Sequence, residues 1–328
     1  LSLAAVLVAV RLLPVLPRLV QRWADCLQLR AFPGSHALEY RKFALLRIIF
    51  AALLLLRALH VRGWLLPEEL TGTVGIFNGL DILACGLVLL GLFTQWALVF
   101  LMFVMWHLGE RVLATSTLGN DVAAMMSLLL VLSNAGRALS LDGWLLHRRP
   151  SLHWVLGYLA SPPGPAVIAL AKFCALYAYW LLCVYSLGMH LEESAWMTGV
   201  AGPMLLSNPF MSAWSGFFES LFTLHEQATL AARIALWLMM LWYAAVLPLT
   251  LLGGWWRRYV IVWGVLFLLL SQGVLNLGSL ALIEFLFWAG VFWPGPIQAI
   301  RVFYDDKCNL CDRTVQFLCR VDVFNQIV

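Results

Sequence analysis

Two cysteines near the end of this 328-residue chain have the spacing of a reactive dithiol. The segment 308–311, Cys-Asn-Leu-Cys, follows a strand predicted at 300–304 and opens a predicted helix. A thiol at a helix N-terminus lies at the positive end of the backbone dipole, which favours the thiolate that attacks disulfides. We therefore expect Cys308 to be the nucleophile and Cys311, one turn later, to resolve the mixed disulfide.

The same spacing also occurs in half of a zinc site, and a motif without activity is a third alternative. Zinc needs two further ligands, of which Cys319 is one candidate, and no histidine follows His225. The order of strand, tight loop, Cys-x-x-Cys and helix favours dithiol chemistry over a metal site.

The residues that lead into the dithiol resemble a known family. With Tyr304, Asp305 and Asp306 before Cys308, segment 302–311 looks like the opening of the DCC family of thioredoxin-like thiol-disulfide oxidoreductases. That family's signature is Tyr-Asp-Gly-x-Cys-x-x-Cys, so Asp306 stands where the family has Gly. The resemblance implies a thioredoxin-like α/β fold. Only 28 residues follow Ile300 and such a domain needs roughly a hundred, so we expect a truncated fragment over 294–328.

The composition of the rest of the chain is that of a membrane protein. Hydrophobic residues make up 62% and charged residues 12%, with a mean hydropathy of +0.88, which excludes an ordinary soluble domain. A net charge of +4, scattered along the chain, gives no reason to expect a nucleic-acid partner. Apolar stretches of about 20 residues predict an all-α polytopic fold with about eight spans. These lie at 43–61, 74–93, 95–113, 121–139, 165–189, 229–252, 259–273 and 275–293.

The distribution of Lys and Arg predicts the orientation of the spans. The segment before the first span, the loop 140–164, residues 253–258 and the tail carry most of the basic residues. The loop 190–228 has four Glu and no Lys or Arg. The positive-inside rule then places both termini in the cytoplasm, in what we expect to be a bacterial inner membrane. We divide the chain into an interfacial segment 1–40, a transmembrane domain 41–293 and the tail 294–328.

Ionisable residues inside the predicted spans are a second set of functional candidates, because charge in a membrane is costly. They are Asp81, Lys172, Arg233 and Glu284, with His190 at the end of a span. The alternative is structural: the Arg side chains snorkel and Lys172 pairs with an acid. Asp81 and Glu284 each need a buried partner or a water-filled cavity. Trp255, Trp256, Trp288 and Trp293 are expected to be interfacial anchors.

The body of the chain also resembles the HTTM family, the membrane domain shared with vitamin K-dependent gamma-carboxylase. The residues that carry this likeness are Gly119-Asn120-Asp121, the run 134–142 and the stretch from Tyr185 to Gly199. In the carboxylase, a Lys base couples vitamin K hydroquinone oxidation to carbanion formation. Here His190 occupies the place where that pattern has Lys, which argues against glutamate carboxylation.

Together these features predict a membrane protein with a cytoplasmic dithiol that exchanges electrons with other thiols and with a membrane quinone. The expected partners are the lipid bilayer and other membrane or redox proteins. The competing hypothesis is a non-catalytic accessory subunit of a larger membrane complex, in which the dithiol has no role.

Overall fold

The computed structural model describes Arg22 and residues 39–64, 72–111, 118–152, 165–276 and 279–293. Across these ranges the chain forms helices and turns without a strand, and one isolated bridge joins Ser212 to Leu275. The predicted interfacial segment and the tail, with Cys308 and Cys311, lie outside the described residues. For the part described, the predicted all-α fold is confirmed.

Within the described ranges, eight apolar helices correspond to the eight predicted spans. Five of them are long and apolar enough to cross a membrane, so the chain is an integral membrane protein. These five are α3 (Glu39–Trp64), α5 (Thr73–Leu90), α10 (Pro165–Glu192), α14 (Glu226–Leu252) and α15 (Gly254–Val274). The three shorter apolar helices are α6 (Thr94–Arg111), α7 (Leu118–Leu132) and α16 (Leu280–Phe292). A total of eight spans stays a prediction.

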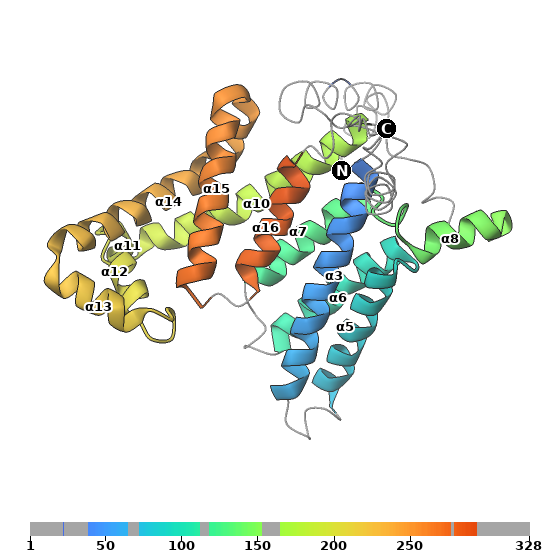
Figure 1. Ribbon diagram of the computed structural model, residues 1–328, viewed down its shortest axis with the longest axis horizontal. Coiled ribbons are helices and arrows are strands. Elements are labelled where there is room, and N and C mark those ends of the chain that lie inside the picture. Colours follow the sequence, from blue (N-terminus) through green and yellow to red (C-terminus); the bar gives the residue numbers. More distant parts are fainter. Residues whose placement is uncertain are drawn as a thin grey trace, which may run out of the picture.

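The long helices form one bundle in which sequence neighbours pack side by side (Figure 1). Helix α3 packs on α5, α5 on α6 and α6 on α7, while α16 closes the group against α3 and α7. On the other side of α16, α15 and α14 pack on each other, and α14 packs on α10. We call the side at which α3 begins and α16 ends the tail side. Short helices gather on the opposite, far side: α11 (Ser194–Met197), α12 (Ala201–Ser207) and α13 (Ser215–Leu224).

One predicted span ends earlier than expected. Apolar residues continue to Leu139, but α7 ends at Leu132 because the backbone turns there. Asn134 and Leu139 have positive φ values of 53° and 50°. This conformation is unusual for a non-glycine residue and needs support from its surroundings.

A buried arginine supplies that support. Arg47 in α3 is fully buried, and its guanidinium donates hydrogen bonds to the carbonyl oxygens of Ala135 at 3.2 Å and Leu139 at 2.5 Å. The turn after α5 packs so closely against this segment that only glycine fits at position 91. Gly91 has φ 67°, and a Cβ atom there would lie 2.5 Å from Cβ of Ser140. Arg47 therefore ties the segment that follows α7 to α3.

Asp142, the second residue of α8 (Leu141–Arg148), holds the start of α6. Its carboxylate accepts hydrogen bonds from the backbone N–H of Phe93 and of Thr94, both at 2.8 Å. It also accepts one from the Thr94 hydroxyl at 2.9 Å. The unpaired N–H groups that begin a helix favour such an anionic partner. We call these contacts the Asp142 clamp.

Trp288 is not the interfacial anchor that the sequence suggested. Its side chain is 2% exposed and packs against α15 at Gly264. A Cβ atom at Gly264 would lie 2.6 Å from the Trp288 indole, so only glycine lets the two helices approach this closely. Trp255 and Trp256, in contrast, are 74% and 53% exposed at the start of α15.

We expect Gly264→Ala to destabilise the protein by about 1–3 kcal/mol, because overpacking forces the buried indole or a helix to move. Thermal unfolding of the purified protein in detergent measures this loss. Gly273→Ala in the same helix is the matched control, since nothing lies within 4 Å of the added methyl position. Equal effects of the two substitutions would show that helix propensity, and not the contact with Trp288, sets the cost.

Candidate functional site

The predicted dithiol, Cys308 and Cys311, and its neighbours Tyr304, Asp305 and Asp306 lie outside the described residues. The candidate site that can be built from the structure therefore consists of the ionisable side chains within the bundle and an apolar cavity. The bundle brings Lys172, Asp81 and Glu284 each to a partner, in three separate places.

Lys172 belongs to a buried charge cluster at the tail side. Its Nζ lies 2.5 Å from Oε1 of Glu39, and Nζ of Lys42 lies 3.1 Å from the same oxygen. The three side chains are 3% exposed or less. Oε2 of Glu39 has no hydrogen-bond partner among the described residues. Two lysine side chains thus share one carboxylate in an almost fully buried site.

Lys42 also fastens the end of α16. It donates hydrogen bonds to the carbonyl oxygens of Gly290 at 3.2 Å and Trp293 at 2.6 Å. The last carbonyls of a helix have no partners within it and carry partial negative charge, which favours a cation there. These contacts tie the C-terminal end of α16 to the start of α3.

The sequence pointed to Lys172 but missed Glu39 and Lys42. Lys172 pairs with an acid, as in the structural alternative, but that acid, Glu39, lies 133 positions earlier in the segment predicted to precede the first span. In the structure α3 already begins at Glu39, so this acid and Lys42 share one face at i, i+3 spacing. That spacing was the available signal.

Asp81 lies in a second polar group, between α3, α5 and α7. Its carboxylate is 3.8 Å from the Cys85 thiol one turn later, and Arg57 acts on it electrostatically. Arg57 also donates a hydrogen bond to the Asn120 side chain. Asp81 is 8% exposed, so these neighbours stand in for the water that it lacks.

Glu284 in α16 forms the third group, at the centre of the bundle. It accepts a hydrogen bond from the Tyr179 hydroxyl at 3.4 Å. The Tyr179 ring packs in turn on Trp242, Phe287 and Trp288. Among the described residues the Tyr179 hydroxyl is the hydrogen-bond donor to this carboxyl. A carboxyl held among aromatic rings in this way is typical of a structural or proton-holding group.

His190 lies near the far side and faces an aromatic partner. Its ring stacks on Trp196 with centroids 3.7 Å apart, and Nε2 lies 3.2 Å from the Ser186 hydroxyl. Neither Lys172 nor Glu284 is among these contacts, so the structure does not join His190 to the other candidates. Among the described residues, no group of three His, Cys, Asp or Glu side chains is placed to hold a metal ion.

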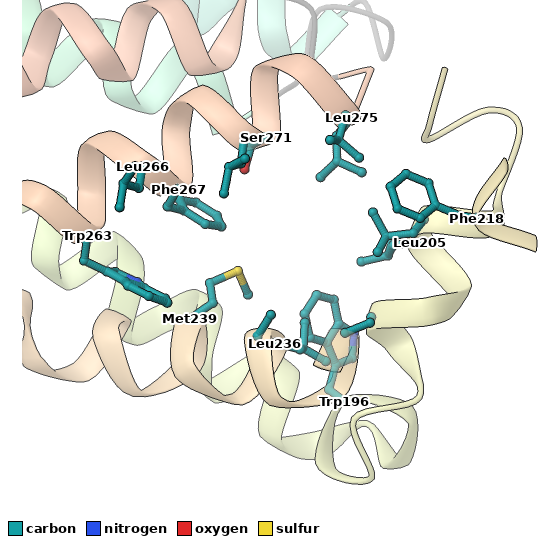
Figure 2. Close-up of a pocket in the computed structure, with 16 residues that line it drawn as sticks. Trp196, Leu205, Phe218, Leu236, Met239, Trp263, Leu266, Phe267, Ser271 and Leu275 are labelled. Atoms are coloured by element: carbon teal, nitrogen blue, oxygen red, sulfur yellow. The ribbon is translucent and has the colours of Figure 1, made fainter. Parts of the chain in front are cut away.

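An apolar cavity of about 420 Å³ opens between α14, α15 and the short far-side helices (Figure 2). Trp263, Phe267 and Ser271 line it from α15, and Leu236 and Met239 face them from α14. Trp196, Leu205 and Phe218 surround its far-side end. Its volume is in the range of small-molecule sites. Among its sixteen lining residues, Ser271 alone carries a hydroxyl and none is charged.

Arg233, another predicted candidate, lies beside this cavity on α14, next to the lining residue Ala232. Its Cβ and Cγ pack against the turn at Gly199, which has φ 74°. The buried Nε atom has no partner, and no described side chain forms an ion pair with the guanidinium. Arg233 is therefore the predicted intramembrane charge whose partner the described residues do not supply.

Comparison with protein-family models, curated proteins and solved structures gave no match to this chain. The resemblance to the HTTM and DCC families thus stays a prediction from the residues quoted above.

Proposed function

We propose that this integral membrane protein carries a thiol-disulfide oxidoreductase dithiol, Cys308 and Cys311, at the cytoplasmic surface of a bacterial inner membrane. The observation that carries the proposal is the Cys-x-x-Cys spacing between a predicted strand and a predicted helix, in a sequence context that resembles the DCC family. The bundle would be an HTTM-like domain of eight spans that holds this tail at the membrane.

The charge distribution supports the cytoplasmic side. Arg148 and Arg149 at the end of α8 and the pair Arg257 and Arg258 at the start of α15 belong to tail-side segments. The far-side segment 190–228 has no Lys or Arg. An excess of basic residues marks the cytoplasmic face of membrane proteins.

The anchoring of α16 limits where the dithiol can act. Lys42 holds Trp293, and Cys308 follows 15 residues later. A chain of that length spans at most about 50 Å when fully extended. The substrates of the dithiol would therefore be disulfides or thiols close to the membrane surface.

The exchange proceeds in two balanced steps. The Cys308 thiolate attacks a substrate disulfide, which forms a mixed disulfide and releases one substrate thiol. The Cys311 thiolate then attacks Sγ of Cys308, which releases the second substrate thiol and leaves a Cys308–Cys311 disulfide. The cytoplasmic dithiol pool resets this disulfide by the reverse exchange, so the protein acts as a reductant or sensor.

A membrane quinone could take part as the acceptor of two electrons and two protons from the dithiol, with quinol as the product. The apolar cavity lies near the far side of the bundle, whereas the dithiol is proposed at the tail side. A quinone in the cavity would therefore be too far from Cys308 to accept its electrons directly. The cavity is lined by the part of α15 from Trp263 onward and by the first half of α14, near the far side. A quinone that reacts with Cys308 would have to meet it at the tail side.

Thiol trapping of the protein in intact membranes, titrated with a dithiol redox buffer, tests the proposal. We expect a reversible two-electron transition, with Cys308 alkylated about tenfold faster than an ordinary thiol because its thiolate is favoured. Cys308→Ser should abolish the transition. Cys174→Ser, which changes a half-buried thiol in α10, is the matched control and should leave it unchanged.

Unreactive thiols at every potential would contradict the dithiol proposal and favour the accessory-subunit hypothesis. Addition of a quinone analogue to the same membranes shows whether the dithiol exchanges electrons with quinone or only with other thiols. Oxidation of the dithiol by the analogue supports coupling to quinone, whereas oxidation by thiol reagents alone restricts the exchange to thiols.

A further inference from the structure

The apolar cavity and Arg233, for which the described part of the chain supplies no ion-pair partner, lie together at the far side. The proposed dithiol chemistry uses neither. Two of the lining residues, Leu266 and Leu270, are 50% and 65% exposed, so the cavity is continuous with the lipid-facing surface of α15. The bilayer is therefore the nearest source of an occupant. A lipid acyl chain fits the apolar walls.

Apolar walls alone do not select an occupant in a membrane, because lipid chains are as apolar as leucine. Selection must come from charge. Arg233 lies one residue from Ala232 and one turn before Leu236, both of which line the cavity. Its guanidinium would give a phosphate group at the far-side end a charge-assisted hydrogen bond in a setting with little water.

The far-side segments that border the cavity carry acidic side chains. Glu193 precedes α11, Glu226 is the first residue of α14, and Glu219 lies in α13. All three side chains are exposed, and no Lys or Arg occurs between 190 and 228. A lipid with only negative charge in its headgroup would be repelled by these carboxylates. A headgroup with an ammonium beside its phosphate would find a partner for each charge.

We propose that the cavity binds an ethanolamine phospholipid. One acyl chain occupies the space between α14 and α15, the phosphate contacts Arg233, and the ammonium group faces the far-side glutamates. Ser271, one of the lining residues labelled in Figure 2, supplies the one hydroxyl of the lining. This site is independent of the proposed dithiol reaction.

The test measures which lipid the protein keeps. The full chain is reconstituted into bilayer discs with equal amounts of ethanolamine, choline and glycerol phospholipids of the same acyl composition. It is then extracted in mild detergent, and native mass spectrometry counts the retained lipids. We expect one ethanolamine phospholipid per chain.

Two variants with matched controls test the two halves of the site. Arg233→Gln should lower retention of the ethanolamine lipid about tenfold, the loss expected for one charge-assisted contact. Ala235→Phe places a ring in the cavity and should remove the retained lipid. Arg258→Gln and Ala231→Phe make the same changes at exposed positions outside the cavity lining and should leave retention unchanged.

Several results would overturn the proposal. Equal retention of the three lipids would show that headgroup charge does not select the occupant, and preferential retention of the glycerol lipid would show that the glutamates do not contribute. Trp263 has a buried N–H without an acceptor among the described residues. Retention of a quinone that Trp263→Phe abolishes would show that a carbonyl compound, and not a phospholipid, occupies the cavity.

Discussion

Replacing Glu39 with Gln should destabilise the protein by about 3–5 kcal/mol, the cost of leaving a buried charge without its partner. The carboxylate is the shared acceptor of Lys172 at 2.5 Å and Lys42 at 3.1 Å. Lys42 keeps the carbonyl oxygens of Gly290 and Trp293, but no other acid forms an ion pair with Lys172 among the described residues. Thermal unfolding of the purified variant in detergent measures the loss.

Removing one of the two lysines from the cluster is the control for Glu39→Gln. Lys172→Met leaves one ammonium and one carboxylate, so we expect a smaller loss than for Glu39→Gln. The double variant Glu39→Gln/Lys172→Met should recover at least half of the stability lost in Glu39→Gln, because the least compensated ammonium is gone. If the two single variants lose equal stability and the double variant loses the sum of both, then packing, and not charge balance, determines the stability of the cluster.

Asp142→Ala should cost about 3–5 kcal/mol, since it removes three hydrogen bonds of the Asp142 clamp at once. The backbone N–H of Thr94 would stay buried without its acceptor, which adds the cost of an unsatisfied polar group. The start of α6 would also lose the anion that complements its dipole. Unfolding in detergent, with hydrogen exchange of the first turn of α6 as a local measurement, tests both effects.

Two variants show whether the contacts themselves carry this stability. Asp142→Asn keeps one acceptor oxygen, so it should lose about half as much stability as Asp142→Ala. Asp121→Ala removes an exposed carboxylate from α7 and should change stability by less than about 0.5 kcal/mol. If the backbone amides in the first turn of α6 exchange hydrogen no faster in Asp142→Ala, the carboxylate is not what holds the start of that helix.

Much of the fold could be predicted from the sequence because the length and apolarity of a membrane helix are local properties. The predicted stretch 229–252 became α14 and 165–189 became α10, each within a few residues. The error at α7 has a tertiary cause. The residues after Leu132 are apolar enough to continue a helix, but the buried Arg47 takes the carbonyl oxygens of Ala135 and Leu139.

The candidate site was predictable only in part. Charge in an apolar stretch identified Lys172, Asp81, Arg233 and Glu284, because such charge is rare in membranes. The partners were not evident, since Tyr179 and Glu284 are 105 positions apart in the chain. The cavity could not be predicted from the sequence, because its lining comes from five helices and each contributes ordinary apolar residues.

The sequence by itself determined that this chain is an apolar helical membrane protein, where its long helices lie and which residues carry unusual charge. These follow from composition and from the cost of placing polar groups in hydrocarbon. The tertiary structure decided which charges meet, because helix packing brings together residues such as Glu39 and Lys172 across 133 positions. It also decided that Arg233 lies beside a cavity with no charged partner among the described residues, since no local pattern specifies how helices cross.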